Sequence, residues 1–374
     1  MKRLLFPLIA AGALYSAEYY VAQYGDDNNP GTFDSPFLTI QQAADTMSAG
    51  DICYIRQGLY HETVTMDDHD GAEGYPIVFT NYNNERVAMD GTVLIDSMWE
   101  VHSGNIWKTT LDYDVWQLFV DWNEMVMARW PNANFEDGSV WDKENHWGHG
   151  TIDEDSEAYE NGTLIDAPHG DVDLAGSGLD ITDAIAILNV GSFKTWTRRV
   201  LTHSGNTFTY DPVPGWKTKH HDYFLEGMLE FLDAETEWFF DIETKMLYFW
   251  APNGADPNEL HIRGKVQSYA FETSNSDHVQ IKNLEFFGTT FKFDNCDYAL
   301  VDRCNLFYSS CYKRMLGVVD TQPEMSIFTS SSNCVVSNSA FRYTDGSALE
   351  MYSGTNKIEE CYFYHIDYTS TDLN

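Results

Sequence analysis

Residues Val279-Gln280-Ile281-Lys282-Asn283-Leu284-Glu285-Phe286 form the first of four copies of one apolar pattern between Asn275 and Phe363. Each copy has an apolar residue, then a small or apolar residue three positions later, then Phe or Leu two positions further on. The first column advances by 20, then 35, then 22 residues. The aligned columns are Ile281/Val301/Val336/Ile358, Leu284/Cys304/Ser339/Cys361 and Phe286/Leu306/Phe341/Phe363.

A repeat of this length, rich in strand-forming and turn residues and without helical spacing, is typical of a β-solenoid. One unit cannot bury its apolar column alone, whereas stacked units share a continuous core. Connections between parallel strands are right-handed in nearly all proteins. The sequence therefore predicts an all-β fold built on a right-handed parallel β-helix. The 35-residue coil carries a loop insertion, Lys313 to Thr329, of the kind that borders a binding face.

Composition limits the partners. The chain of 374 residues has 22 Lys and Arg against 58 Asp and Glu, which gives a net charge of −36. This charge opposes binding to nucleic acid and to anionic membrane surfaces. It also opposes binding to a polyanionic substrate, but less strongly. Solubility in a salty medium is the simpler interpretation of the charge.

The N-terminus has the pattern of an export signal. Met1-Lys2-Arg3 is basic, and the apolar stretch Leu4 to Leu14 is too short to span a membrane. We assign residues 1–17 to the signal and predict a secreted or cell-surface protein without membrane insertion. Among the six cysteines, Cys304 and Cys361 belong to an interior column, whereas Cys296 and Cys311 could form a local disulfide or stay free.

Residues 18–96 are predicted to hold the N-terminal cap and the first coils. Thr39 and Gln42 have capping-box spacing, apolar residues follow at helical spacing, and Gly50 would end the helix. A short helix at this point would cover the open end of a solenoid. Expected strands are Tyr19 to Ala22, Ile52 to Ile55, Thr63 to Met66, Ile77 to Thr80 and Val87 to Met89.

Residues 97–262 are predicted to be an inserted antiparallel β-sandwich-like domain. All eleven tryptophans, from Trp99 to Trp250, fall inside this stretch, which marks a change of composition. Its expected strands are Gln117 to Asp121, Thr207 to Tyr210, Trp238 to Asp241 and Met246 to Trp250, the last two as a hairpin, with a short helix over Glu226 to Leu232.

Residues 263–374 return to β-helix coils. They stop within a turn and without a capping element, so we expect a fragment of a longer protein or a covered end. The uncovered end also permits self-association.

Two sets of motifs resemble known families. The first resembles the opening of pectate-lyase-like right-handed parallel β-helix proteins, which include exported polysaccharide lyases and glycosidases. It comprises Tyr20-Val21, Gly25-Asp26, Asn29-Pro30-Gly31-Thr32, Ser35-Pro36-Phe37, Thr39-Ile40-Gln41, Ala49-Gly50-Asp51 and Gly58-Leu59-Tyr60. The second resembles β-helix glycosidases with an inserted β-sandwich, among them β-xylosidases. It comprises Gln117 to Asp121, Ala128 to Asn132, Glu237 to Asp241 and Lys245 to Trp250.

The repeat itself proposes an active site. Residues 22 apart on the last two coils should lie above one another, about 4.8 Å apart. Two stacked carboxyl groups suit glycoside hydrolysis, because retaining glycosidases separate their carboxyl groups by about 5 to 5.5 Å and inverting ones by more. A pair of solvated turn aspartates is the alternative. The predicted pairs are Asp345 with Asp367, Tyr343 with His365, Arg342 with Tyr364, and Glu350 with Asp372.

A lyase would need different groups. Lys313, Arg314 and Arg303 could stabilise the charge formed on a uronate, if they converge, and an ordinary solvated loop is the alternative. Calcium is a possible cofactor at Asp26 to Asn29, although this run is equally an Asx-rich turn. Trp141, Trp147 and Trp216 are candidate sugar platforms or core residues.

The sequence thus predicts an exported carbohydrate-active protein whose partner is a polysaccharide or oligosaccharide. Its most favoured activity is hydrolysis of a plant or algal glycan in a groove on residues 275–374, beside the inserted domain. The predicted catalytic residues are Asp345, Asp367 and His365, and the predicted substrate-binding residues are Tyr343, Arg342, Tyr364, Glu350, Lys313 and Arg314. A polysaccharide lyase and a non-catalytic surface or filament-forming β-solenoid are the alternatives.

Overall fold

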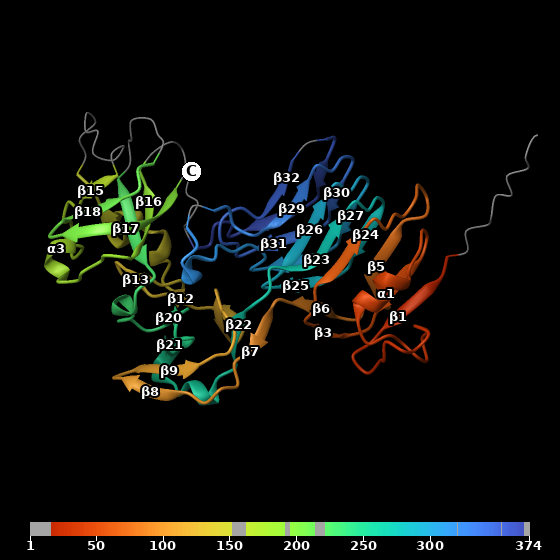
Figure 1. Cartoon of the computed structure of the whole chain (residues 1–374), viewed down its shortest axis with the longest axis horizontal. Coiled ribbons are helices and arrows are strands. Elements are labelled where there is room, and N and C mark those ends of the chain that lie inside the picture. Colours follow the sequence, from red (N-terminus) through yellow and green to blue (C-terminus); the bar gives the residue numbers. More distant parts are fainter. Residues whose placement is uncertain are drawn as a thin grey trace, which may run out of the picture.

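The computed structural model of the chain describes residues 16–151, 162–190, 195–213, 221–319, 321–352 and 354–369. The predicted export signal lies almost entirely outside these residues, as do Trp216 and Asp372. In Figure 1 the coils run from β1 and helix α1 to β32, and the remaining strands lie to one side of them.

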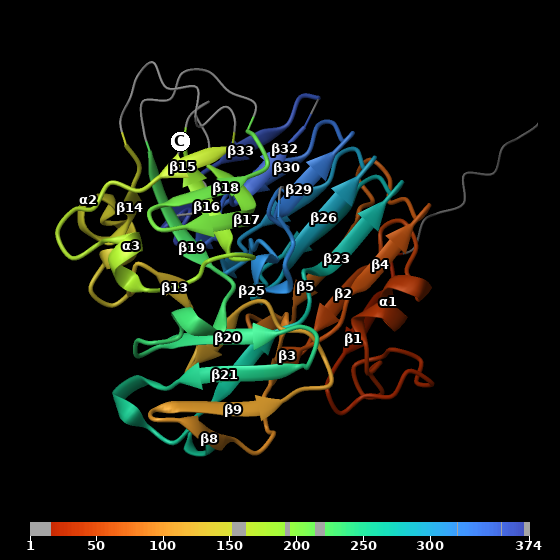
Figure 2. The same ribbon diagram turned by 60° about the vertical axis from the view of Figure 1, so that its left-hand side comes forward.

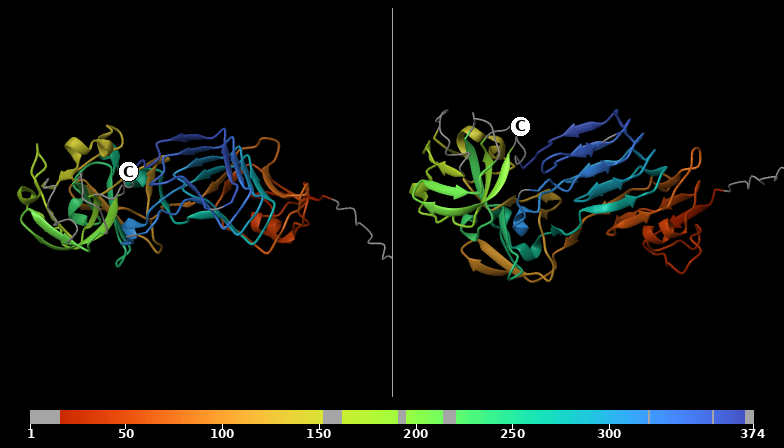
Figure 3. Two further views of the ribbon diagram at one scale, coloured as in Figure 1. Left: turned by 90° about the horizontal axis from the view of Figure 1, so that it is seen from above. Right: turned by 45° about the horizontal axis from the view of Figure 1, so that its top comes forward.

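Three parallel sheets form a right-handed β-helix, as predicted (Figure 3). Sheet I contains β1 (Glu18–Val21), β2 (Ile52–Ile55), β5 (Ile77–Asn81), β24 (Val279–Lys282), β27 (Leu300–Asp302), β30 (Val335–Ser337) and β33 (Lys357–Glu359). Sheet II contains β3 (Gly58–Tyr60), β6 (Val87–Asp90), β25 (Glu285–Phe287), β28 (Asn305–Phe307), β31 (Ala340–Arg342) and β34 (Tyr362–Tyr364). Sheet III contains β4 (Val64–Asp67), β23 (Tyr269–Ser274), β26 (Thr290–Asp294), β29 (Ser326–Thr329) and β32 (Leu349–Met351).

The predicted interior columns are confirmed by the strand register. The column Ile281/Val301/Val336/Ile358 pairs in order along sheet I, and Phe286/Leu306/Phe341/Phe363 pairs in order along sheet II. Both columns are fully buried until the last coil, where Ile358 is 47% and Phe363 42% exposed. Among the described residues, no strand pairs with the outer edge of that coil.

The corner after each sheet II strand positions aromatic side chains. Gly288, Tyr308, Tyr343 and His365 occupy this corner in successive coils, all with φ between 50° and 60°. Gly288 is required there, because a Cβ would lie 2.9 Å from Thr92 Cγ2. The other three side chains stack: ring centroids are 5.3 Å apart for Tyr308 and Tyr343, and 5.6 Å apart for Tyr343 and His365. The predicted stacking of Tyr343 with His365 is therefore confirmed.

Helix α1 (Ile40–Thr46) begins as predicted, since the Thr39 hydroxyl accepts a hydrogen bond of 3.1 Å from the Gln42 N–H. It ends at Thr46, before Gly50. Its buried residues Ile40, Ala43 and Ala44 join the β-helix core, so the helix covers the first coil.

Between β6 and β23 the chain forms three further sheets, which we call the insert (Figure 2). The first contains β7 (Thr92–Leu94), β10 (Leu118–Val120), β11 (Asn123–Glu124) and β22 (Ile262–Lys265), and the second β8 (Glu100–Ser103), β9 (Ile106–Thr110), β12 (Val126–Met127), β20 (Glu237–Asp241) and β21 (Met246–Trp250). The third contains β13 (Arg129–Trp130), β14 (Gly148–His149), β15 (Thr163–Ile165), β16 (Ile185–Asn189), β17 (Trp196–Ser204), β18 (Thr207–Tyr210) and β19 (Asp222–Glu226).

Strand pairing in the insert is antiparallel except between β12 and β20, and the hairpin of β20 with β21 is as predicted. The sandwich form of the insert stays a prediction. Its first and last strands, β7 and β22, pair with each other, and the Val266 N–H donates to the Gly91 oxygen at 3.0 Å. The two ends of the insert therefore lie side by side.

The short helix predicted over Glu226 to Leu232 is confirmed only in part. Glu226 ends strand β19, and only a 3₁₀ turn, η2 (Leu229–Phe231), follows it. The other short helices are η1 (Ser139–Trp141), α2 (Lys143–His146), α3 (Leu174–Ser177), η3 (Pro252–Gly254), η4 (Pro257–Glu259) and η5 (Arg314–Leu316). All six cysteines are free thiols, which decides against the disulfide between Cys296 and Cys311. None of the helices in the described ranges is long and apolar enough to cross a membrane.

Candidate functional site

A groove of about 880 Å³ runs along the outer face of sheet II and meets the insert. Because side chains alternate along a strand, Phe287 and Phe307 point outward while Phe286 and Leu306 fill the core. The residues that line the groove are Gln57, Gly58, Leu59, Arg86, Ala88, Trp122, Asn123, Glu285, Phe286, Phe287, Phe307, Tyr308, Tyr343 and Tyr368.

Aromatic contacts join the floor of the groove to its wall. The indole of Trp122, from the insert, lies edge-on to Phe287 with ring centroids 4.9 Å apart. Tyr308 is 5.5 Å from Phe287, and Tyr368 is 5.0 Å from Tyr343. At the other end, Arg86 and Glu285 form an ion pair of 2.9 Å. A floor of aromatic faces with a few polar groups suits a sugar chain.

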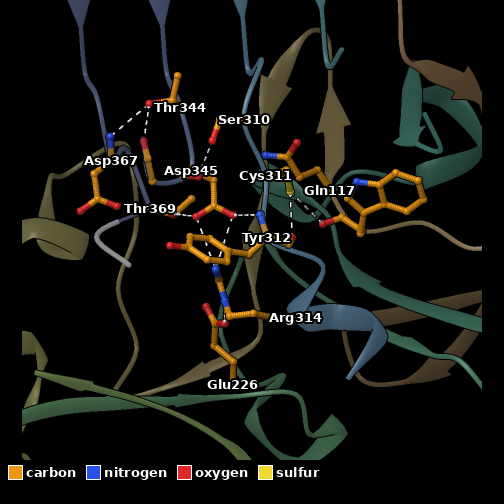
Figure 4. A network of polar contacts seen from close by, with 12 residues as sticks. Gln117, Glu226, Ser310, Cys311, Tyr312, Arg314, Thr344, Asp345, Asp367 and Thr369 are labelled. Atoms are coloured by element: carbon orange, nitrogen blue, oxygen red, sulfur yellow. Dashed lines mark hydrogen bonds and ion pairs between the residues drawn. The ribbon is translucent and has the colours of Figure 1, made fainter. Parts of the chain in front are cut away.

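A buried ionic cluster lies between the last coils and the insert (Figure 4). Asp345 is 1% exposed. It accepts hydrogen bonds from the Tyr312 N–H at 2.9 Å and from the Thr369 hydroxyl, and Arg314 Nη1 lies 3.4 Å from it. The Nε of Arg314, itself 1% exposed, donates to Glu226 on β19 at 2.8 Å. Glu226, a residue of the insert, therefore fixes the side chain of Arg314 in the position where it contacts Asp345.

A second buried carboxyl group, Glu124, belongs to the same region. Its Oε1 accepts a hydrogen bond of 2.8 Å from Gln117 Nε2. Burial, reinforced by the negative charge of Asp345, raises the pKa of Glu124 to about 8. Lys265 is also buried, and its ammonium donates to the backbone carbonyl oxygen of Tyr308 at 3.2 Å. Burial lowers the pKa of Lys265.

The predicted stacking of Asp345 above Asp367 stays a prediction, since the strand pairing of sheet II ends at Arg342 with Tyr364. The backbone N–H of Asp345 donates to Ser310 on the preceding coil, at 3.2 Å. After His365 the chain turns, and the Asp367 N–H donates to the Thr344 hydroxyl at 3.2 Å. Asp367 also has φ of 59°, outside strand geometry. The 22-residue offset continues past the paired strands as far as Thr344, whose N–H donates to the His365 carbonyl oxygen at 3.2 Å, and Figure 4 shows the two aspartates on neighbouring segments.

The remaining predicted residues divide between the groove and other faces. Arg342 and Tyr364 pair in register on sheet II as predicted, and the Arg342 guanidinium lies 5.2 Å from the Phe307 ring. His365 lies 5.4 Å from the indole of Trp141. Glu350, by contrast, is on β32 of sheet III and therefore faces away from the groove.

The cationic residues that a lyase would need do not converge. Arg303, in the corner between sheets I and II, contacts Asn283 and Asp302. Lys313 pairs with Glu324 at 2.9 Å and lies over the ring of Trp116. Arg314 has buried carboxylate partners, so its predicted contact with substrate does not fit its position.

The other candidates are structural. Trp147 is fully buried, which excludes it as a sugar platform. Trp141 is partly exposed, and its indole N–H donates to the backbone carbonyl oxygen of Tyr368 at 2.9 Å. Asp26 accepts a hydrogen bond from the Asn28 N–H, as in an Asx turn, and Asp27 accepts hydrogen bonds from the N–H groups of Leu38 and Thr39. Within the described ranges, no group of three or more His, Cys, Asp or Glu is placed to hold a metal ion.

Sequence reasoning missed Glu124, Gln117, Glu226 and Tyr368. The first three come from the insert, and their distance along the chain from Asp345 gives no repeat or spacing that could have identified them. Gln117 lies in a stretch that was predicted as a strand and noted for its resemblance, without a role in the site.

Comparison with known proteins supports the fold. Residues 19–116 match a family model described as the Pel9A-like right-handed β-helix region. YwoF of Bacillus subtilis is 41% identical over 86 residues, which are 23% of this chain and 18% of that protein. Pectate lyase PEL9 of Emericella nidulans is 36% identical over 91 residues, which are 24% of this chain and 21% of that enzyme. The alignments thus span about a fifth of each relative.

Two solved structures share the architecture over nearly the whole chain. A glycoside hydrolase matches 95% of this chain and 74% of its own, with a TM-score of 0.71 and 16% identity. XylC in complex with xylose matches 96% of this chain and 55% of its own, with a TM-score of 0.53 and 16% identity. The chain is accordingly a right-handed parallel β-helix protein, pectate-lyase-like in its first coils and similar in fold to glycoside hydrolases that have the same architecture.

Proposed function

We propose that the protein is a carbohydrate-active enzyme that hydrolyses a glycosidic bond in the groove. The observation that carries this proposal is an aromatic floor, formed by Phe287, Phe307, Tyr308 and Tyr343, with two buried carboxyl groups behind the lining of the groove. Glu124 follows the lining residue Asn123, and Asp345 accepts a hydrogen bond from Thr369, which follows the lining residue Tyr368. The names of the similar proteins, a glycoside hydrolase, XylC with xylose and a pectate lyase, support a carbohydrate as the substrate.

Hydrolysis is favoured over elimination by the charges. A lyase stabilises the charge formed on a uronate with cations. Arg86 is the cationic residue in the described lining of the groove, and it is paired with Glu285. The net charge of −36 also opposes a polyanionic substrate. We therefore propose a neutral plant or algal polysaccharide or oligosaccharide, and an exported enzyme.

Asp345 is suited to the role of the ionised carboxylate. Three donors, the Tyr312 N–H, the Thr369 hydroxyl and Arg314, hold it in one orientation. Such a group either attacks the anomeric carbon or activates a water molecule there, while a second carboxyl group protonates the leaving oxygen. The sequence predicted Asp367 as the partner of Asp345 in a catalytic carboxyl pair, without dividing the two roles between them.

The test is a panel of neutral and uronate-containing glycans, with release of reducing ends and absorbance of unsaturated uronates measured together. Reducing ends without that absorbance are expected. Asp345→Asn should lower the rate by about 10² to 10⁴-fold, whereas Asp112→Asn, at an exposed position, should leave it unchanged. Absorbance would indicate a lyase, and the absence of both signals would indicate a non-catalytic solenoid. Full hydrolysis by Asp345→Asn would contradict the assignment of Asp345.

A further inference from the structure

Glu124 lies directly behind the wall of the groove. It follows Trp122 and Asn123, which line the groove, and it is 8% exposed. Its Oε1 is bonded to Gln117, and its Oε2 is buried without a hydrogen-bond partner in the described part of the chain. Glu124, Gln117, Arg314 and Thr369 line a separate small cavity of about 20 Å³. A buried carboxyl oxygen without a partner is costly unless a ligand or a proton compensates for it.

Burial is the main reason that Glu124 favours its protonated form, and the negative charge of Asp345 adds to it. The hydrogen bond from Gln117 and the positive charges of Lys265 and Arg314 act in the opposite direction and offset only part of this, so the pKa of Glu124 is raised to about 8. Burial, and after it the charge of nearby Glu124, raises the pKa of both Tyr308 and Tyr368. Glu124 therefore holds a proton at neutral pH, as a general acid must.

Two consecutive residues connect the lining of the groove with that of the small cavity. Tyr368 lines the groove, and Thr369 lines the small cavity. The Tyr368 ring is stacked on Phe135 with centroids 4.4 Å apart and an interplanar angle of 11°, and it lies 5.3 Å from Trp141. Phe135 lines the small cavity together with Glu124, and Thr369, which follows Tyr368, donates a hydrogen bond to Asp345.

We propose that Glu124, and not Asp367, donates the proton to the glycosidic oxygen, and that substrate reaches it by displacing Tyr368. This inference rests on the proposed hydrolysis. The bond between the anomeric carbon and the glycosidic oxygen breaks, and that oxygen takes the proton of Glu124. Water gives its hydroxyl group to the anomeric carbon, and its remaining proton restores the Glu124 carboxyl group.

Leaving-group dependence tests the role of Glu124. Glu124→Gln should slow cleavage of an oligosaccharide by about 10² to 10⁴-fold, because an alkoxide leaves poorly without a proton. Release of nitrophenol from an aryl glycoside of the same sugar, in a single turnover, should fall by less than about tenfold, because nitrophenolate needs no proton. The fall of kcat/KM above pH 8 in the unmodified protein should disappear in the variant.

Two parallel variants make the result specific. Glu272→Gln, exposed on sheet III, should behave as the unmodified protein. If Asp367→Asn shows the leaving-group dependence and Glu124→Gln does not, the inference fails while the proposed function stands. If the unmodified protein cleaves no glycan, both fail.

Chemical labelling tests the displacement of Tyr368 without relying on activity. A water-soluble carbodiimide with an amine should modify Glu124 several-fold faster in Tyr368→Ala than in the unmodified protein. Tyr362→Ala, on the same coil and outside this contact, should leave the labelling rate unchanged. Equal rates in Tyr368→Ala and the unmodified protein, measured by mass spectrometry, would overturn the displacement of Tyr368.

Discussion

At the scale of single residues, burial of acidic groups between the insert and the coils dominates the chemistry. Glu124 and Glu237 are both buried, and burial raises the pKa of each to about 8. Glu237 has a structural setting, since three backbone N–H groups, those of Asp233, Ala234 and Arg129, donate to it. Glu124 has one donor and an oxygen without a partner, which is the setting of a functional group.

The raised pKa of Glu124 predicts a pH dependence of stability. Between about pH 4.5 and pH 8 the folded protein binds this proton and the unfolded chain releases it, so the free energy of unfolding falls as pH rises. Glu124→Gln should remove up to about 1.4 kcal/mol per pH unit from this fall. Urea unfolding of both proteins at pH 5, 6, 7 and 8 measures the difference. Parallel curves would show that Glu124 titrates normally.

At the scale of elements, two side chains cap the N-terminus of helix α1, and one of them, Glu62, comes from the first coil. The Thr39 hydroxyl accepts from Gln42, and the carboxylate of Glu62 accepts from the N–H groups of Ile40 and Gln41 at 3.0 and 3.1 Å. These bonds satisfy donors that a helix leaves unpaired at its N-terminus.

Thr39→Ala should therefore lower the free energy of unfolding by about 1 kcal/mol, the usual effect of losing an N-cap. Thr46→Ala, in the last turn of the same helix, is the control and should change it by less than about 0.5 kcal/mol. Chemical denaturation measures both. Equal effects of the two substitutions would mean that the cap contributes nothing.

Elements also show how far the sequence could predict the molecule. The columns headed by Ile281 and Phe286 were predictable, because each coil repeats the same local rule of inward and outward side chains. The same rule found Tyr343 with His365 and Arg342 with Tyr364. For Asp345 and Asp367 its result stays a prediction, because both residues lie beyond the last strand pair, Arg342 with Tyr364, where the length of the turn also sets the position. It could not find Glu124 or Glu226, because a separate sheet brings them to the site.

At the scale of the whole molecule, the insert and the coils share a buried interface. Met315, which follows the β-helix strand β28, packs in a core cluster of the insert, and Arg314 joins Glu226 to Asp345. Breaking a buried ion pair by removing one partner costs about 3 to 5 kcal/mol, because the remaining charge is left uncompensated.

The two parts should therefore unfold together. Since all eleven tryptophans lie between Trp99 and Trp250, tryptophan fluorescence reports on the insert, while far-ultraviolet circular dichroism reports on the whole chain. The two signals should give coincident transitions. Arg314→Met should separate or weaken them. Arg303→Met should not, because Arg303 is exposed and its partner Asp302 keeps hydrogen bonds from Ser337 and Asn338. Separate transitions in the unmodified protein would contradict a shared interface.

The pairing of β7 with β22 has a consequence for synthesis on the ribosome. Strand β6 stacks directly on β25, with Ala88 beside Glu285, although nearly two hundred residues of polypeptide emerge between them. Strand β6 therefore cannot pair with β25 until the insert has been synthesised. Because β7 and β22 pair with each other, a folded insert brings its two flanking segments together before β25 is synthesised. The segments β6 and β25 are then far apart in sequence but close in space.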